Sequence, residues 1–269
     1  MSASLPAGFL DAALDAAQRA ADAASTVIVA RYAAQDFSVT TKEDSSPVTE
    51  ADHEAEQVIK RVLREAFPNH AFLGEEFGRE GDSRYLWLID PIDGTKSFVR
   101  GYPMFSTQIA LMVDGELVLG VSDASAYGER AWAVRGGGAF LRPRQGPSVA
   151  LTVSAATEFG PATAVSTGNL KAMAGDPSRW NALAGLIKRV GRIRGYGDFL
   201  HYHLLARGAI DLVIESDLNI LDIAALVVIV REAGGVFTDL DGGPIGLQTR
   251  DALAGPAALH AQALRLFAR

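Results

Sequence analysis

Two aspartates spaced three residues apart are the best candidates for chemistry in this sequence. They are Asp90 and Asp93, in the motif DPIDGT. Asp90 follows the apolar segment 85–89, so its carboxylate is expected at the end of a strand, where open sheets place ligands. Pro91 lacks an N–H group and favours extended geometry at Asp90, which helps to end the hydrogen bonding of the strand. A turn would let both carboxylates and the Ile92 carbonyl converge, and such hard oxygen donors suit Mg²⁺ or Mn²⁺.

The residues after this pair, 94–97 (GTKS), predict the start of a short helix. The N-terminus of a helix presents free N–H groups to an anion, so a phosphate could bind there beside the metal ligands. An isolated D-x-x-D pair has an ordinary alternative, because aspartates near turns often cap helices. Taken alone, Asp90 and Asp93 are better explained as capping residues.

Two further acidic segments change that balance. Glu75 and Glu76 follow a short apolar segment upstream of Asp90, although on their own they indicate only a solvated loop. Asp222 lies in the apolar run 219–226 (NILDIAAL), and a carboxylate at the start of a hydrophobic helix needs a partner. A helix N-cap role and a shared metal ion would each provide one, and both stay open.

The elements that must position these acids begin with two helices, at 10–34 and 49–67, joined by a polar loop at 41–48. Thr49 and Asp52 form a capping pattern that places Asp52 in a first helical turn. An antiparallel meander follows, with strands at 85–89, 106–113, 116–121 and 130–134 and a hairpin turn at Asp114-Gly115. Residues 135–138 (RGGG) are interpreted as a turn before a strand at Phe140 rather than as a phosphate-binding loop.

The second half of the chain alternates strands and helices after the polar segment 142–148. The predicted strands lie at 162–166 and 211–214, and the predicted helices at 180–190, 199–208 and 224–233. His201 and His203 are two positions apart in one of these helices and do not share a face, which argues against a metal pair. His53, beside Asp52, is interpreted as an exposed helix residue. The sequence has no Gly-x-Ser-x-Gly motif, which disfavours a serine hydrolase.

Composition excludes several other classes of function. The 269 residues are 48% hydrophobic and carry a formal charge of −7, which gives no basic surface for a nucleic-acid polymer. The absence of cysteine excludes disulfides and thiolate ligands, so a metal must bind oxygen or imidazole. The N-terminal region carries acids where a signal peptide needs basic residues, and the longest apolar run, 223–230, is too short for a membrane span. A cytoplasmic location with no membrane partner is expected.

Several of these segments together resemble the signature motifs of the inositol monophosphatase family, within the Mg²⁺-dependent, Li⁺-sensitive phosphatases. In chain order they are 47–52 (PVTEAD), 74–76 (GEE), 87–98 (WLIDPIDGTKSF), 221–225 (LDIAA) and 232–235 (EAGG). The resemblance implies an α/β (α+β) fold of five α-β-α-β-α layers. It also implies an antiparallel half, 1–143, a half with a mixed sheet and the substrate-selecting residues, 144–269, and a homodimer. One departure is Leu221, where many relatives have Trp.

Matched position by position, the resemblance implies two main metal positions. Glu75, Asp90 and the Ile92 carbonyl would hold one ion, and Asp90, Asp93 and Asp222 a second. The expected cofactor is Mg²⁺, two to three ions per site, with Mn²⁺ as a substitute.

The same resemblance implies the catalytic and substrate-binding roles. Glu75 and Thr95 would orient the attacking water, with a third, weakly held metal as a further route, and Asp52 would support that position. The implied substrate-binding residues are Asp93, Gly94, Thr95, Asp198, Glu215 and Asp222. Hydrolysis of a small phosphate monoester by an activated water is the expected reaction, without a covalent phosphoenzyme.

For the alcohol part of the ester, the segments 95–101, 133–140, 194–199 and 206–211 are similar to the histidinol-phosphatase branch of the family. In the family alignment Glu215 contacts the alcohol and Asp198 takes a neighbouring place. Two acids near one pocket favour a cationic leaving group, and histidinol carries an ammonium and an imidazole. The alternative for Asp198 is a helix N-cap, and the two roles can coexist.

Rival functions remain beside hydrolysis of histidinol phosphate in histidine biosynthesis. One is an inositol-1-phosphatase, or a broad-specificity phosphatase of sugar and nucleotide phosphates. A phosphatase of 3′,5′-bisphosphates or of fructose bisphosphate would need a second basic cluster, and none is evident in the sequence. A non-catalytic binding protein would have to explain the complete set Glu75, Asp90, Asp93, Thr95 and Asp222.

Overall fold

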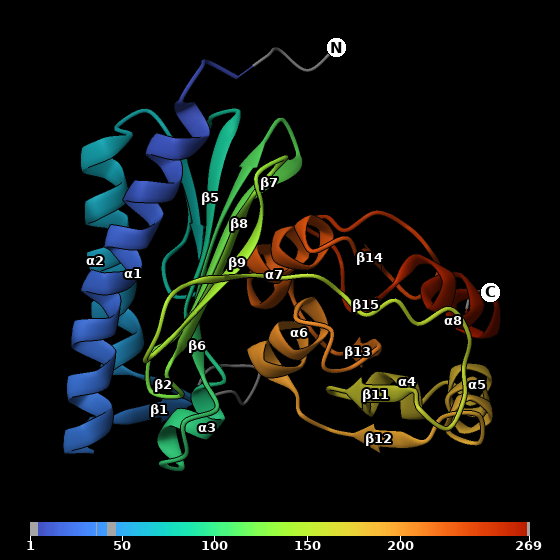
Figure 1. The fold of residues 1–269 in the computed structure, drawn as a ribbon. Coiled ribbons are helices and arrows are strands. Elements are labelled where there is room, and N and C mark those ends of the chain that lie inside the picture. The colour runs from blue at the N-terminus through green and yellow to red at the C-terminus, as the bar shows by residue number, and fades with distance from the viewer. Residues whose placement is uncertain (1–4, 36, 42–46, 268–269) are drawn as a thin grey trace.

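The computed structural model describes residues 5–35, 37–41 and 47–267, and in them the chain forms five layers (Figure 1). Helices α1 (Phe9–Ala34) and α2 (Glu50–Ala66) cover one face of an eight-stranded sheet. Helices α6 (Asp198–Ala206) and α7 (Ile220–Glu232) lie between this sheet and a five-stranded sheet. The outer layer consists of α4 (Lys171–Ala174), α5 (Pro177–Ile187) and α8 (Ala257–Phe267). The predicted α-β-α-β-α fold is confirmed.

The eight-stranded sheet has the order β10-β9-β8-β7-β6-β5-β3-β4. Its strands are β3 (Ala71–Gly74), β4 (Gly78–Glu80), β5 (Tyr85–Asp93), β6 (Ser106–Val113), β7 (Glu116–Ala124), β8 (Glu129–Val134), β9 (Gly138–Pro143) and β10 (Val149–Ala150). All neighbouring pairs are antiparallel except β3 with β5. The predicted meander is therefore confirmed. Asp114 and Gly115 both have positive φ at the β6–β7 turn, as a tight hairpin requires.

The five-stranded sheet is mixed, with the order β12-β11-β13-β15-β14. Its strands are β11 (Ala164–Thr167), β12 (Arg192–Arg194), β13 (Leu212–Ser216), β14 (Val236–Thr238) and β15 (Asp251–Gly255). Strand β11 pairs in parallel with β12 and β13, whereas β15 is antiparallel to β13 and β14.

Residue size and polarity explain the layers. The buried face of α1 is almost entirely alanine, which lets the helix approach α2 and the sheet closely. Helix α7 has an apolar surface on all sides and ten buried residues, because it packs against both sheets. One hydrophobic core surrounds α6 and α7 and includes residues from both halves of the chain. The division of the chain at residue 143 stays a prediction.

Several predicted boundaries differ from the structure. Two short paired strands, β1 (Val39–Thr41) and β2 (Pro47–Thr49), lie at the two ends of the predicted loop at 41–48. The central residues of this loop, 42–46, lie outside the described residues. Helix α5 begins three residues before its predicted start, because Asp176 caps it and Pro177 occupies its first position. Helix α7 begins at Ile220, four residues before its predicted start, because Asn219 caps it. The short helix expected at residues 94–97 is α3 (Thr95–Val99).

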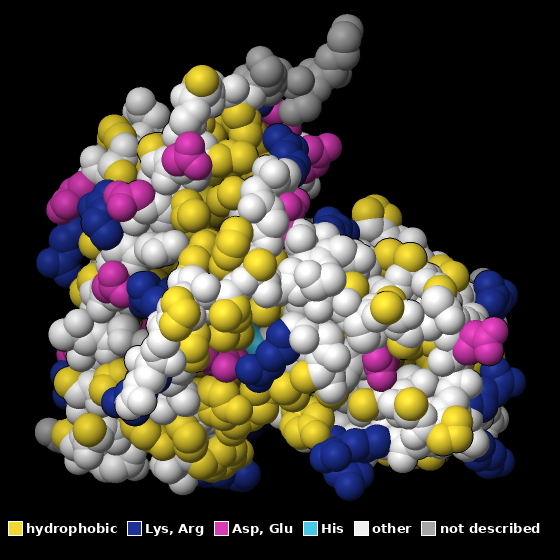
Figure 2. All heavy atoms as spheres, viewed as in Figure 1, with side chains coloured by type: hydrophobic (Ala, Val, Ile, Leu, Met, Phe, Trp, Pro, Cys, Tyr) yellow, Lys and Arg dark blue, Asp and Glu magenta, His cyan; other side chains and the backbone are white. Residues whose placement is uncertain are grey.

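Figure 2 shows the side chains on one face of the molecule. Hydrophobic side chains are spread over both parts of this face, and Lys and Arg side chains lie along its margins. Within the described part of the chain, no helix is long and apolar enough to cross a membrane.

Candidate metal centre and active site

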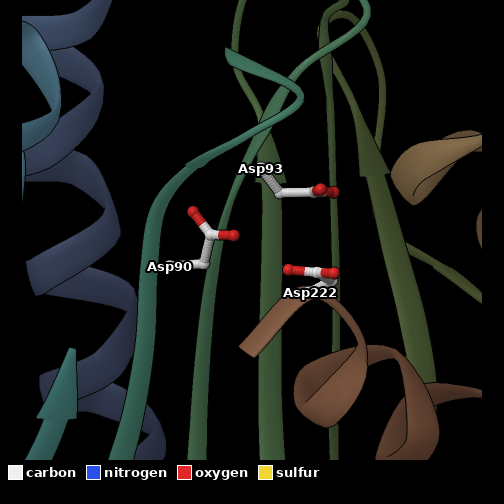
Figure 3. A group of neighbouring side chains, drawn as sticks. All are labelled: Asp90, Asp93 and Asp222. Atoms are coloured by element: carbon white, nitrogen blue, oxygen red, sulfur yellow. The ribbon is translucent and has the colours of Figure 1, made fainter. Parts of the chain in front are cut away.

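Three of the predicted acids converge where the two halves meet. One carboxylate oxygen from each of Asp90, Asp93 and Asp222 lies within 4.8 Å of the other two. Figure 3 shows their side chains pointing into one space, two from the end of β5 and one from the start of α7. Residues more than 120 positions apart in the sequence are therefore neighbours here.

A β-bulge places Asp90 and Asp93 on the same side of their strand. Side chains alternate along a strand, so residues three apart would normally point to opposite faces. The pairing of β5 with β6 shifts between these two aspartates, from Asp90 opposite Gln108 to Asp93 opposite Ser106. The extra residue restores a common direction. The predicted end of the strand before Asp93 is wrong in this detail, since β5 continues through Asp93.

Hydrogen bonds fix the bulge at the two residues between the aspartates. The Ile92 N–H donates to Asp90 Oδ1 at 3.0 Å, and the Thr107 hydroxyl donates to the Pro91 carbonyl at 2.9 Å. The Ile92 carbonyl accepts a hydrogen bond from Thr95 Oγ1 at 2.9 Å. A carbonyl oxygen has a second lone pair, so this contact leaves the Ile92 carbonyl able to bind a cation.

Asp222 is the third residue of α7 rather than its N-cap, so the capping interpretation is corrected. Asn219 is the N-cap, and the two residues form a capping box in which Asp222 Oδ2 accepts the Asn219 N–H at 2.8 Å. A first-turn carboxylate is also favoured by the helix dipole. The cap interaction holds the side chain in place, and its other oxygen can face Asp90 and Asp93.

A capping box also positions Asp52, at the start of α2. Thr49 caps α2, and Asp52 Oδ2 accepts hydrogen bonds from the Thr49 N–H and hydroxyl at 2.8 and 2.6 Å. The predicted capping pattern and the first-turn position of Asp52 are confirmed. Thr95 Oγ1 lies 3.5 Å from the free oxygen, Oδ1. Asp52 therefore reaches the start of α3.

Glu75 follows the end of β3 and approaches Asp90 from the neighbouring strand. Its N–H donates to the Ile89 carbonyl at 3.1 Å, which extends the parallel pairing of β3 with β5. The charge of Glu75 and a side-chain hydrogen bond with it contribute to the raised pKa of Asp90. Glu75 thus stands beside the three aspartates, although it is outside their 4.8 Å cluster.

Burial and mutual repulsion make this group of acids costly in the charged form. Burial is the main cause that raises the pKa of Asp90 and Asp93 well above the ordinary value, and the neighbouring carboxylates add to it. Burial also raises the pKa of Asp222 to about 7 and that of Asp52 to about 6. A bound cation would relieve the same repulsion.

The donor set fits a divalent cation. Asp93 Oδ2 is buried without a hydrogen-bond partner among the described residues, which is rare for a carboxylate oxygen. All the candidate ligands are oxygen atoms, and several acids share one small space. Hard cations such as Mg²⁺ prefer such sites.

At Gly94 the chain turns sharply from β5 into α3. Gly94 has φ 88°, and a Cβ atom on it would come within 2.6 Å of the Met104 carbonyl oxygen. A residue with a side chain does not fit here. The glycine therefore allows the first turn of α3 to follow the aspartates directly.

A small polar cavity extends from the aspartates toward the predicted substrate-selecting residues. It is lined by Asp93, Asn169, Asp198, Tyr202, Glu215, Leu218, Asp222 and Ile223. The sequence did not single out Asn169 or Tyr202. The Tyr202 hydroxyl donates to Glu215 Oε2 at 2.9 Å, and the Asn169 N–H donates to Oε1 at 3.4 Å. No local sequence signal marks these two residues, because both contacts depend on how α6 and β11 pack around β13.

Asp198 is the first residue of α6, and its N-cap interpretation is wrong because Gly197 occupies that position. Its φ of 45° is unusual for a residue with a side chain. Burial, followed by the nearby charge of Glu215, raises the pKa of Asp198 to about 6. Strained backbone and crowded acids are features that functional sites tolerate.

His201 and His203 lie apart, as their spacing predicts, whereas His53 is only partly exposed. His201 points toward Glu215, with its Nε2 atom 3.2 Å from Oε2, whereas His203 bonds to Glu129 and Ser122 in the other direction. They do not form a pair. The side chain of His53 is 45% exposed, and its Nδ1 atom lies 4.0 Å from Glu76.

Comparisons with known proteins agree with this fold and site. The model of the "Inositol monophosphatase family" matches residues 10–269. A histidinol-phosphatase of Mycobacterium tuberculosis is 41% identical over 91% of this chain and 93% of its own length. An inositol-1-monophosphatase of Rhizobium meliloti is 36% identical, over 82% of each chain. The crystal structure of the extragenic suppressor protein SuhB from Bartonella henselae superposes with a TM-score of 0.84 at 31% identity, over 95% of this chain and 98% of that one.

The layered fold, the buried oxygen-only centre and these relatives define a metal-dependent phosphoric monoester hydrolase. The chain belongs to the inositol monophosphatase family, as the motifs predict. Its reaction is the hydrolysis of a phosphate monoester.

Proposed function

We propose that the preferred substrate is histidinol phosphate, which the enzyme hydrolyses to histidinol and phosphate in histidine biosynthesis. The observation that carries this proposal is the pair of acids, Asp198 and Glu215, in the cavity beside Asp93 and Asp222. A carboxylate pair of this kind attracts an alcohol that carries positive charge, which inositol lacks. The histidinol-phosphatase names of the relatives at about 40% identity support the same substrate.

We also propose the predicted ligand assignment. Glu75, Asp90 and the Ile92 carbonyl would hold one cation, and Asp90, Asp93 and Asp222 a second, with Mg²⁺ as the ion and Mn²⁺ as a substitute. When bound, such cations lower the pKa of water and neutralise charge on phosphoryl oxygens. The buried Asp93 Oδ2, which has no hydrogen-bond partner in the described part of the chain, supports the assignment.

The residues of the chain itself orient water and phosphate. The Thr95 hydroxyl donates to the Ile92 carbonyl, so its oxygen can accept a hydrogen bond from the attacking water. Glu75 can take a proton from that water, and Asp52 Oδ1 lies 3.5 Å from the Thr95 hydroxyl oxygen. The first turn of α3, which begins after Gly94, offers N–H groups to the phosphate.

Phosphate release from a panel of esters tests the substrate. The panel contains histidinol phosphate, inositol-1-phosphate and fructose-1,6-bisphosphate, with Mg²⁺ or with EDTA. We expect the highest kcat/KM on histidinol phosphate and no turnover in EDTA or by Asp93→Asn. A kcat/KM on inositol-1-phosphate that is equal or higher sinks the histidinol assignment, and activity in EDTA sinks the metal mechanism.

A charge-neutral substitution tests the acidic cavity separately. Asp198→Asn keeps the shape of the side chain and removes its charge. We expect kcat/KM for histidinol phosphate to fall about tenfold, equivalent to about 1.4 kcal/mol, with little change for inositol-1-phosphate. An unchanged ratio between the two substrates refutes the role of Asp198.

The second candidate is an inositol-1-phosphatase, and its support is the inositol-1-monophosphatase name of relatives at about 36% identity. The same panel separates it from the first. The homodimer and the cytoplasmic location stay predictions, and sedimentation of the purified protein measures the first of them.

A further inference from the structure

One face of α2 carries a buried line of polar residues. Asp52, Glu56 and Lys60 follow one another at intervals of four, which places them on the same side of the helix. Their exposed fractions are 1%, 0% and 4%. Asp52 belongs to the site already described, whereas Glu56 and Lys60 have no part in it so far. Buried ionisable residues are uncommon unless they are paired, so the partners of these two residues are informative.

Glu56 accepts hydrogen bonds from the chain immediately after the proposed metal ligand Glu75. The N–H of Glu76 donates to Glu56 Oε2 at 2.7 Å, and the N–H of Phe77 donates to Oε1 at 3.3 Å. The Glu75 N–H donates to the Ile89 carbonyl, so the backbone N–H groups of residues 75, 76 and 77 all make hydrogen bonds. The backbone of Glu75 is therefore fixed from β5 on one side and from α2 on the other.

Gly74 shows how closely the Glu56 carboxylate packs against this segment. A Cβ atom on Gly74 would overlap that carboxylate group. The φ angle of Gly74 is not in the positive region, so its backbone would accept a residue with a side chain. The space that Glu56 occupies, and not the local conformation, requires glycine before Glu75.

Lys60 neutralises the buried carboxylate. Lys60 Nζ lies 2.6 Å from Glu56 Oε1 and 2.7 Å from Glu80 Oε1. Buried ion pairs add little net stability, because the cost of desolvation offsets the attraction, and apolar residues can often replace them. Two N–H groups could not be satisfied by apolar residues, however. The arrangement is better explained by positioning than by stability.

We infer that Glu56, neutralised by Lys60, is a positioning residue that holds Glu75 in the geometry required for metal binding. The inference rests on the proposed role of Glu75 as a ligand. Residues that orient a ligand commonly change metal affinity 10–100-fold when they are replaced. Substitution of Glu56 should thus weaken metal binding rather than abolish the reaction.

Calorimetric titration of the whole protein with Mn²⁺ tests this inference without substrate. Glu56→Gln keeps the size of the side chain but places an amide where two N–H donors and Lys60 need a carboxylate. We expect its Mn²⁺ affinity to fall about tenfold or more. The Mg²⁺ concentration for half-maximal phosphatase activity should rise by a similar factor, and kcat at saturating Mg²⁺ should return close to the native value.

The matched control is Glu80→Gln. It removes the half-exposed partner of Lys60 and leaves the N–H bonds of Glu56 intact. Native Mn²⁺ affinity is expected for this control. Equal affinity in Glu56→Gln and native protein overturns the inference, as does an equal loss in both variants.

Gly74 provides a second test that does not depend on the folding of Glu56→Gln. Gly74→Ala should displace the Glu56 carboxylate and weaken Mn²⁺ binding in the native background. In a Glu56→Ala background the space is free, so the same substitution should have no further effect. Additive losses overturn the inference. Native protein that binds Mn²⁺ but does not hydrolyse histidinol phosphate refutes the proposed substrate and leaves this inference standing.

Discussion

Asp93 shows at the scale of one residue how function opposes stability. Its buried Oδ2 atom has no hydrogen-bond partner among the described residues, and its charge is crowded by other carboxylates. Asp93→Asn keeps the shape and removes the charge. In EDTA we expect the variant to gain about 1 kcal/mol, a rise in Tm of about 2–4 °C, because repulsion is relieved.

Differential scanning fluorimetry with and without Mg²⁺ measures this effect. Mg²⁺ should raise the Tm of the native protein and leave that of Asp93→Asn nearly unchanged, because binding to the folded state is the source of the stabilisation. If the variant has a lower Tm than the native protein in EDTA, the electrostatic argument fails.

The titration of the same acids predicts how stability depends on pH without metal ions. Burial raises the pKa of Asp222 from 3.8 to about 7 and that of Asp52 to about 6. Between the unfolded and folded pKa values, the folded protein holds protons that the unfolded chain has released. Stability is therefore greatest below about pH 4 for these groups and is lost as the pH rises toward about 7. In EDTA, these groups should therefore stabilise the folded protein more, and raise its Tm more, at pH 5 than at pH 8.

Two comparisons isolate the contribution of these acids. Asp222→Asn cannot titrate, so the difference between its Tm and the native Tm should grow from pH 5 to pH 8. Saturating Mg²⁺ should oppose the native trend, since the metal binds deprotonated carboxylates. A pH profile in EDTA that is identical in the two proteins contradicts the raised pKa of Asp222.

Individual residues were predictable where their neighbours in the sequence carry the signal. Asp90 and Asp93 belong to one short motif, and Asp222 stands out as a charge in an apolar helix. Tyr202 and Glu56 carry no such signal, since the Glu215 carboxylate and the Glu76 N–H group that they bond lie outside their own helices. The spacing of Glu56 and Lys60 is also that of an ordinary exposed helix pair.

At the scale of elements, the two helices that deliver acids start in the same way. Both α2 and α7 begin with a capping box whose third residue is an aspartate of the site. The sequence predicted the first of these boxes because Thr49 precedes an amphipathic helix. It missed the second, since Asn219 lies next to an apolar run without a clear start. The bulge in β5 was also not predictable, because it depends on the register with β6.

Substitutions at two helix caps can separate an effect on the position of Asp222 from an effect on the stability of the whole protein. Asn219→Ala removes the cap of α7, whose Oδ1 atom accepts the Leu221 N–H at 2.6 Å. Asp176→Ala removes the cap of α5, in the outer layer. Each should cost about 1 kcal/mol, or about 2–4 °C in Tm. Only Asn219→Ala should also weaken Mn²⁺ binding, because only its helix carries Asp222.

Calorimetry and thermal unfolding of the two cap variants give the required comparison. Equal Mn²⁺ affinity in both would mean that the start of α7 does not position Asp222. A loss of affinity in Asp176→Ala would show that general destabilisation, and not position, weakens the site.

The whole molecule depends on α7, which is packed between the two sheets (Figure 1). The resemblance to a known family implied the five layers, but the residues alone predicted only helices and strands. Strand β15 illustrates the difficulty, because it lies between β13 and β14 and follows both of them in the chain. Its place is set by contacts distant in sequence. Periodicity in a short segment does not reveal such contacts.

The contact between β7 and α7 should control both the fold and the metal centre. Gly120 of β7 faces α7, and a Cβ atom there would overlap the Ala225 carbonyl oxygen and crowd its backbone. Backbone atoms cannot move aside as a side chain can, so Gly120→Ala should push α7 away from the sheet. We expect a loss of about 1–3 kcal/mol. Asp222 moves with its helix, so Mn²⁺ binding should weaken as well.

Gly185 of α5 is the matched control, because no described atom lies within 4 Å of the Cβ that alanine would add and its φ is not positive. Gly185→Ala should stabilise the protein by about 0.5–1 kcal/mol, since alanine favours a helix interior, and should leave Mn²⁺ affinity unchanged. Chemical unfolding gives the free energies, and calorimetry gives the affinities. Native stability in Gly120→Ala would mean that the sheet and α7 can separate without cost. The position of Asp222 would then not depend on the packing between the layers.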